Sequence, residues 1–223
     1  VGSEMCIRDR LKTPLTTISG YAQMISNGMA KAEDIKEFGR KIEKESDRLL
    51  TLIDDIINLS NIDEQGSIEN PENIDLSLVT EEAICVLEKA AKERGIQIYY
   101  TKIPTFIKGN VTLVSELVYN LLDNAIKYNK DNGKITVFVG ESAKGVELSV
   151  KDTGIGIPPE DTERIFERFY RVDKSHSKKV GGTGLGLSIV KHVCACHNAT
   201  IRVKSKVGKG TTIYVTFPNN VNN

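Results

Sequence analysis

Residues 111–128 of the chain run VTLVSELVYNLLDNAIKY. Apolar residues recur there every three or four positions, which predicts an amphipathic helix over 111–127. Asn120 and Asn124 are one turn apart on the same face of that helix, and Lys127 lies close to it. Amide oxygens suit Mg²⁺, an ion that keeps several waters and takes few protein ligands beside substrate phosphates. The pattern therefore predicts either a magnesium site or a polar face that caps the helix.

Helices and strands alternate on both sides of this segment. Two more helices are predicted at 78–94, where Gly95 ends the helix, and at 183–197. Strands are predicted at 96–100, 134–139, 146–151, 201–205 and 211–217, the last two as a hairpin around Gly208-Lys209-Gly210. This mixture favours an α/β sandwich, with helices on one face of a mixed sheet.

Residues 11–61 follow a different pattern. Apolar residues repeat in steps of four and three, with a break at Asn27-Gly28 and with Glu45 in the one polar slot. The repeat consists of Leu11, Leu15, Ile18, Ala22, Ile25, Met29, Ile35, Phe38, Ile42, Leu49, Leu52, Ile56 and Leu59. Such a narrow stripe is typical of a coiled coil or bundle. We expect a helical hairpin that pairs with a second copy into a four-helix bundle, the alternative being packing against the second half. Pro14 should kink a helix that begins upstream of it.

Composition excludes several classes of protein. The chain has 223 residues with 30 basic and 30 acidic side chains, so net charge does not suggest nucleic-acid or membrane-surface binding. No apolar run approaches the roughly 20 residues that span a bilayer. The four cysteines do not form a disulfide framework, and Cys194, Cys196 and His197 lack the spacing of a zinc site, which predicts core positions.

Two glycine-containing segments carry further chemical signals. In Asp152-Thr-Gly154-Ile-Gly156-Ile-Pro158, a carboxylate at a strand end can accept a hydrogen bond from a base amino group while the backbone passes close to the ring. An ordinary turn is the alternative. Residues 181–187, GGTGLGL, lead into an apolar helix, where backbone N–H groups and the helix dipole favour phosphate. The segment fits neither a Walker loop nor a dinucleotide fingerprint.

The stretch before these glycines is basic. Residues 168–180 hold Arg168, Arg171, Lys174, Lys178 and Lys179 against one acid, Asp173. It is predicted to be either a mobile lid over a polyphosphate or a solvated loop.

Together these segments resemble the sensor histidine kinases of bacterial two-component systems. Residues 120–128 are similar to the N box of that family, 152–158 to the G1 box, 165–171 to the F box and 182–187 to the G2 box. The hairpin with Leu11-Lys12-Thr13-Pro14-Leu15 is similar to the dimerisation and phosphoacceptor domain. The resemblance covers 11–218 and implies an α+β protein, in which a hairpin of a dimeric four-helix bundle precedes an α/β sandwich of the histidine-kinase/gyrase/chaperone superfamily.

The chain is accordingly divided into five parts. We expect a non-native lead-in at 1–10, the hairpin at 11–63, a linker at 64–71, the ATP-binding domain at 72–218 and a tail at 219–223.

The resemblance implies that ATP and Mg²⁺ bind. Asn120 and Asn124 would hold Mg²⁺, Lys127 the phosphates, and Asp152 the adenine amino group. The other ATP-binding positions carried over are Tyr128, Gly154, Gly156, Ile157, Arg168, Phe169, Gly182, Thr183, Gly184, Leu185, Gly186 and Leu187. The family's chemistry is phosphorylation of a histidine by ATP, followed by transfer to an aspartate of a response regulator. A second copy and that regulator's receiver domain are the implied partners, with no nucleic acid.

One departure from the family affects the reaction itself. The family has His-Glu directly before Leu11, as phosphoacceptor and proton acceptor, and this chain has Asp9 and Arg10. The three histidines, His176, His192 and His197, all lie in the second half and are interpreted as structural or exposed. Thr13 matches a family position that helps dephosphorylate the regulator, although it is equally well explained as a helix residue before Pro14.

Two explanations of this departure are open. Either the chain is a pseudo-kinase, a nucleotide-binding dimer that acts as a docking or phosphatase module, or residues 1–10 are foreign to a kinase fragment. We favour the second, which makes the chain the cytoplasmic part of a membrane-attached sensor kinase. A topoisomerase, chaperone, mismatch-repair or anti-sigma-kinase type of ATPase is a third hypothesis, which the heptad hairpin disfavours.

Overall fold

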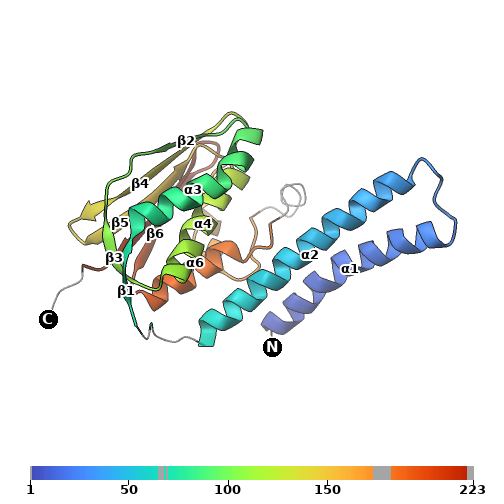
Figure 1. Cartoon of the computed structure of the whole chain (residues 1–223), viewed down its shortest axis with the longest axis horizontal. Coiled ribbons are helices and arrows are strands. Elements are labelled where there is room, and N and C mark those ends of the chain that lie inside the picture. The colour runs from blue at the N-terminus through green and yellow to red at the C-terminus, as the bar shows by residue number, and fades with distance from the viewer. Residues whose placement is uncertain (1, 65–67, 69, 173–181, 220–223) are drawn as a thin grey trace. The chain divides into compact units, whose positions relative to one another are not determined.

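The computed structural model describes residues 2–64, 68, 70–172 and 182–219. The chain divides into two compact units, one comprising Val1–Ser60 with Gly181–Thr183 and the other Asn61–Val180 with Gly184–Asn223. Helices α1 and α2 belong to the first unit, and a sheet with its covering helices belongs to the second (Figure 1).

The first unit is a helical hairpin, as the heptad repeat predicts. Helix α1 spans Gly2–Ser26 and helix α2 spans Ile35–Glu64, antiparallel to it (Figure 1). Gly28 lies in the turn with φ of +67°, in the left-handed region that glycine adopts without strain. The described residues before Leu11 belong to α1. Helix α1 contains Pro14, which costs it one backbone hydrogen bond.

Much of the apolar surface of the hairpin is exposed within the single chain. Tyr21 and Phe38 pack with ring centroids 4.9 Å apart and so join the two helices. Leu15 is nevertheless 55% exposed. The heptad frame also missed a second row on α2, where Leu50, Ile53 and Ile57 are exposed and follow one another at spacings of three and four. One hairpin therefore presents apolar rows that it does not bury itself.

The second unit contains a five-stranded mixed sheet in the order β2-β4-β5-β7-β6. The strands are β2 (Gln97–Tyr100), β4 (Lys134–Ser142), β5 (Gly145–Asp152), β6 (Thr200–Lys206) and β7 (Gly210–Phe217). Strands β2 and β4 are parallel, and the other neighbours are antiparallel. Alternate residues of the central strands are buried, such as Ile135, Leu148 and Val215. This alternation gives the sheet one packed face and one open face.

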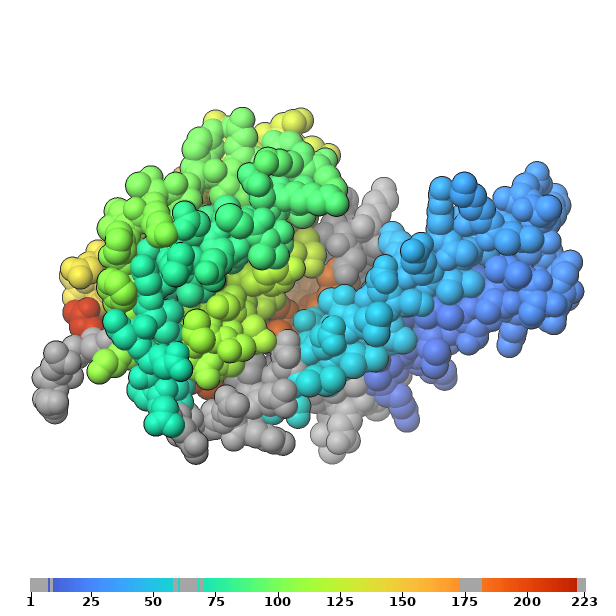
Figure 2. Space-filling model, viewed as in Figure 1, coloured from blue at the N-terminus to red at the C-terminus, as the bar shows by residue number. Residues whose placement is uncertain are grey.

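Three helices cover the packed face, which confirms the predicted sandwich (Figure 1). They are α3 (Leu76–Glu93), α4 (Val111–Lys127) and α6 (Gly186–Cys196), and Figure 2 shows α3 at the surface of this unit. The bounds of α4 match the prediction, and Gly95 ends α3 with φ of +64°. Helix α6 begins at Gly186, three residues after the predicted start, because Gly184 takes a φ of +82° that a right-handed helix cannot contain.

Short elements escaped the sequence analysis. Strands β1 (Glu72–Asp75) and β3 (Phe106–Gly109) form a two-stranded sheet, and 3-10 turns occupy Pro159–Asp161 and Arg164–Phe166. The end of β1 has a clear local cause, because Asp75 Oδ1 accepts the Ser77 N–H at 2.9 Å and so caps α3.

His197 is a buried core residue, in agreement with the prediction that the histidines are structural or exposed. His176 lies outside the described residues. Nδ1 of His197 donates to the Val193 carbonyl oxygen at 2.8 Å, and Nε2 of His197 accepts the Asn110 N–H at 3.2 Å. The ring also meets Phe217 edge-on, with centroids 5.9 Å apart. Because Nε2 faces a donor, this arrangement requires the neutral ring.

We expect the second unit to lose stability in mild acid because of His197. Burial lowers the pKa of His197 below its usual 6.5, and the bond to the Val193 carbonyl offsets only part of this. Below pH 6.5 the unfolded chain therefore binds a proton that the folded chain resists. The free energy of unfolding should have its full value above pH 6.5. It should decrease as the pH falls from 6.5 toward the lower pKa that His197 has in the folded chain. Urea unfolding between pH 7.5 and 5 measures this slope.

A matched pair of variants isolates the contribution of His197. His197→Gln should flatten the slope, whereas His192→Gln, which changes a partly exposed residue of the same helix, should leave it as in the parent. An identical slope in all three proteins would contradict the prediction.

Candidate nucleotide-binding site

The polar face of α4 presents two amide side chains in a fixed orientation. Asn120 Nδ2 donates to the Glu116 carbonyl at 2.9 Å, and Asn124 Nδ2 donates to the Asn120 carbonyl at 2.7 Å. Since both NH₂ groups bond to the backbone one turn earlier, both Oδ1 atoms face away from those carbonyls. Neither side chain caps the helix, because Asn110 does so by accepting the Leu113 N–H at 3.1 Å. Each side chain therefore keeps its amide oxygen as a hard acceptor.

The start of α6 lies directly against these amides. A Cβ atom on Gly186 would come within 2.7 Å of Asn120 Oδ1 and 3.2 Å of Asn124 Nδ2. The N-cap residue of α6, Leu185, is buried and makes no capping hydrogen bond through its side chain. The first N–H groups of α6 and the positive end of its dipole thus lie beside two amides, an arrangement suited to a phosphate with its cation.

Lys127 lies one turn beyond the two asparagines. Its Nζ forms an ion pair with Asp123 Oδ2 at 2.6 Å, and both side chains are partly exposed. Asp123 was not predicted as the partner of Lys127, although a spacing of four residues on a helix is the expected signal for such a pair. The ammonium group is therefore held at the end of the polar face.

Asp152, at the end of β5, is held through one of its two oxygens. Oδ1 accepts the Gly154 N–H at 2.7 Å and the Thr211 N–H at 3.2 Å. Burial raises the pKa of Asp152, and these two backbone donors offset part of the rise. Within the described part of the chain, Oδ2 has no hydrogen-bond partner. A partly buried carboxylate with one oxygen fixed and the other open is suited to accept an amino group of a ligand.

The loop after Asp152 runs in close contact with its neighbours. A Cβ on Gly154 would lie 2.2 Å from the Tyr128 carbonyl oxygen, and Ile155 N–H donates to that oxygen at 3.1 Å. Gly156 takes a φ of +72°, and a Cβ there would lie 2.2 Å from the Lys206 carbonyl oxygen. Both glycines are thus required by close approach of backbone, as the motif suggests.

Two backbone outliers meet at the edges of the basic segment. Phe169 is buried with φ of +65°, and its N–H donates to the Gly184 carbonyl at 2.8 Å. A Cβ on Gly184 would lie 3.0 Å from the Phe169 Cα. A non-glycine residue in the left-handed region costs on the order of 1–3 kcal/mol. Arg168 is exposed, whereas Lys174, Lys178 and Lys179 lie outside the described residues.

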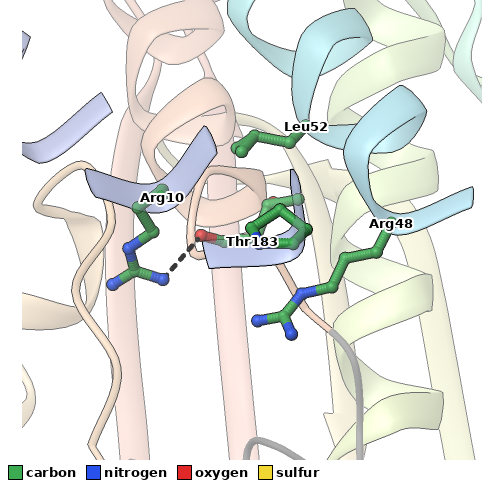
Figure 3. Close-up of a pocket in the computed structure, with 5 residues that line it drawn as sticks. Arg10, Arg48, Leu52 and Thr183 are labelled. Atoms are coloured by element: carbon green, nitrogen blue, oxygen red, sulfur yellow. Dashed lines mark hydrogen bonds between the residues drawn. The ribbon is translucent and has the colours of Figure 1, made fainter. Parts of the chain in front are cut away.

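The first unit contains a small pocket (Figure 3) lined by Arg10, Pro14, Arg48, Leu52 and Thr183. Arg10 donates to the Thr183 carbonyl at 3.5 Å, and Thr183 Oγ1 donates to Asp55 Oδ2 at 2.6 Å. Arg10, which stands where the family has its glutamate, thus carries a side chain that contacts Thr183.

Among the described residues no group of three or more His, Cys, Asp or Glu side chains is placed to hold a metal ion, and no helix there is long and apolar enough to cross a bilayer.

Comparison with known proteins agrees with this geometry. The family described as "Histidine kinase-, DNA gyrase B-, and HSP90-like ATPase" matches residues 109–221, and "His Kinase A (phospho-acceptor) domain" matches residues 7–65. The "Sensor-like histidine kinase SenX3" of Mycobacterium tuberculosis is 36% identical over 214 residues, which are 95% of this chain and 52% of the relative. The chain thus spans about half the length of the curated relatives it matches.

Two solved structures are also similar. Full-length ShkA in complex with AMPPNP is 26% identical, with a TM-score of 0.68 over 92% of this chain and 43% of ShkA. The histidine kinase ThkA in complex with the response regulator TrrA is 21% identical, with a TM-score of 0.76 over 98% of this chain and 61% of ThkA, and shows the fold alone.

The fold and site define an ATPase-type domain of the histidine-kinase, gyrase and Hsp90 class. The chain belongs to the sensor histidine kinases of two-component systems, which by family are ATP-dependent protein-histidine kinases.

Proposed function

We propose that the second unit binds ATP with Mg²⁺ between the polar face of α4 and the start of α6. The observation that carries this proposal is the contact of Gly186 with Asn120 and Asn124, since it joins an anion-binding helix start to two oriented amides. Asn120 and Asn124 Oδ1 would hold Mg²⁺, and Lys127 would neutralise phosphate charge. The AMPPNP complex of ShkA supports nucleotide binding at this fold.

The base would lie at the other end of the site. Asp152 Oδ2 would accept the adenine amino group, and Tyr128, Gly154, Gly156 and Ile157 would also bind the nucleotide. Arg168 and Phe169 would belong to the lid, and Gly182, Gly184 and Gly186 would let it close over the phosphates. Positioning and charge neutralisation supply most of the catalysis in phosphoryl transfer, which such a site can provide without a covalent step on the domain itself.

A glycine-to-alanine variant tests the Mg²⁺ site directly. We expect the parent to bind ATP more tightly with Mg²⁺ than with EDTA, in calorimetric titrations. Gly186→Ala should reduce the Mg²⁺-dependent gain in ATP affinity about tenfold, because its Cβ displaces the Asn120 amide. Alanine has a higher helix propensity than glycine, so the substitution should not weaken α6 itself. The thermal midpoint should hardly change. Gly20→Ala, at a helical glycine with nothing within 4 Å of a Cβ, is the matched control. ATP binding that ignores Mg²⁺ in the parent would refute the metal assignment.

The first unit is proposed as the dimerisation and phosphoacceptor-type hairpin, within the five-part division 1–10, 11–63, 64–71, 72–218 and 219–223. In the intact form, a histidine of the hairpin would be phosphorylated and the phosphoryl group passed to an aspartate of a response regulator; the match of residues 7–65 to the phospho-acceptor domain supports this. Thr13 would support dephosphorylation of that regulator. A cytoplasmic location and membrane attachment of a longer parent stay predictions.

Asp9 and Arg10 favour a second candidate function, because neither the phosphoacceptor imidazole nor its carboxylate partner stands at those positions. In that case the chain is a catalytically silent ATP-binding dimer that acts as a docking or phosphatase module.

We expect the hairpin to form a dimer through its exposed apolar rows. Leu50→Glu/Ile53→Glu should convert the dimer to a monomer in light scattering, since charges buried in an apolar seam weaken association by at least about 3 kcal/mol, or roughly 100-fold. Val86→Glu, which changes a residue that is 69% exposed on α3, should leave the dimer intact. A parent that is monomeric at 100 μM would contradict the four-helix bundle.

A further inference from the structure

Asn129 is a buried polar residue just beyond the end of α4, and all its polar atoms are bonded. It is 4% exposed. Its Oδ1 accepts the Lys130 N–H at 3.0 Å and the Thr153 hydroxyl at 3.1 Å, and its Nδ2 donates to the Lys134 carbonyl at 3.2 Å. A Cβ on Gly133 would lie 2.3 Å from Asn129 Oδ1, so the amide is also confined sterically.

Thr153 closes this network. Its Oγ1 accepts the Lys134 N–H at 2.9 Å while donating to Asn129, and its own N–H donates to the Lys134 carbonyl at 3.1 Å. Three segments are therefore tied at one point: the second residue after α4, the first residue of β4 and the residue after Asp152. Buried networks with every member bonded hold their parts in one arrangement.

Arg94 fixes the same region from the end of α3. Its guanidinium donates to the carbonyls of Ile126, Lys127 (3.0 Å) and Asn129 (2.7 Å). It also pairs with Asp131 at 3.1 Å. The last turn of α4 is thus capped by a side chain from another helix. Tyr128, which lies inside this capped turn, is the residue whose carbonyl accepts the Ile155 N–H.

We propose that Asn129 and Thr153 are positioning residues that set the preference of the site for adenine. This inference rests on the proposed ATP site, in which Asp152 and Tyr128 lie at the base. The Asn129–Thr153 pair determines how far the Asp152 loop stands from the end of α4, and neither side chain needs to touch the nucleotide. A buried acceptor discriminates between an amino group and a carbonyl only when it is held in place, and a displacement of about 1 Å can cost 100-fold.

The test compares ATP with ITP, whose base carries a carbonyl in place of the adenine amino group. Calorimetric titrations with Mg²⁺ would give both dissociation constants for Thr153→Val, which removes the hydroxyl at nearly constant volume. We expect the ratio of ATP to ITP affinity to fall about tenfold, with ITP affinity changed less than about twofold. Thr153→Ser keeps the hydroxyl and should restore the ratio. Thr136→Val, at an exposed residue of β4, should leave it unchanged.

The outcomes separate this inference from the proposed function. If ATP and ITP weaken equally in Thr153→Val while the thermal midpoint falls, the network is only structural and the inference fails. If the parent does not bind ATP, the proposed function fails as well. Should Thr153→Val not fold, Thr153→Ala removes the same hydroxyl with less strain, and its ATP-to-ITP ratio decides the matter in the same way.

Discussion

The double variant Asp9→His/Arg10→Glu should take up label from γ-labelled ATP and Mg²⁺, whereas the parent chain stays unlabelled. The ATPase-type domain that would deliver the phosphoryl group is present, but position 9 offers no imidazole to accept it. Label on the double variant should be acid-labile and base-stable, as a phosphohistidine is. A carboxylate that takes the proton contributes about 100-fold or more, so Asp9→His alone should label far more slowly.

Controls show what each result means. Arg10→Glu alone should remain unlabelled, because it still lacks the acceptor. Asp9→His/Arg10→Glu combined with Asp152→Asn should lose its label if ATP must bind at the proposed site. No label on the double variant, although it is a folded dimer that binds ATP, would exclude the kinase interpretation for this chain and favour the docking module.

Asp152→Asn should abolish most ATP binding without destabilising the fold. The amide can still accept the Gly154 and Thr211 N–H bonds through Oδ1, but it presents an NH₂ group where Oδ2 stood. Two donors then face each other at the adenine amino group, which should cost about 2–3 kcal/mol, or roughly 30- to 150-fold in affinity. Titration calorimetry with ATP measures this loss.

Stability provides the internal check on this variant. Burial raises the pKa of Asp152, so the folded chain retains this proton to a higher pH than the unfolded chain, and ionisation lowers the free energy of unfolding as the pH rises through that range. Replacement by a neutral amide removes this cost, so urea unfolding at pH 7 should show equal or greater stability. Asp54→Asn, an exposed residue of α2, is the matched control and should bind ATP normally. Normal ATP affinity in Asp152→Asn would remove Asp152 from the base site.

The local spacing of apolar residues was sufficient to predict the long helices. The spacing of apolar residues predicted both helices of the hairpin, and it predicted α4 to its end residues, because an amphipathic helix of 17 residues repeats its period several times. The glycine at the end of α3 and those around the β6–β7 hairpin marked turns for the same local reason. Strands β1 and β3, each four residues long, are stabilised by pairing with each other, which no local period can show.

The sequence by itself therefore determined the helices, the main strands and which short segments carry chemistry. Only the tertiary structure decided which groups meet: Gly186 with Asn120, the Thr211 N–H with Asp152, Arg94 with the end of α4, and Asn129 with Thr153. These partners are 24 to 66 residues apart in the chain, and their contacts depend on strand order and helix packing rather than on the period of any one segment. Hydrogen bonds and close contacts act over about 3 Å, so the site exists only where folding has brought such distant segments together.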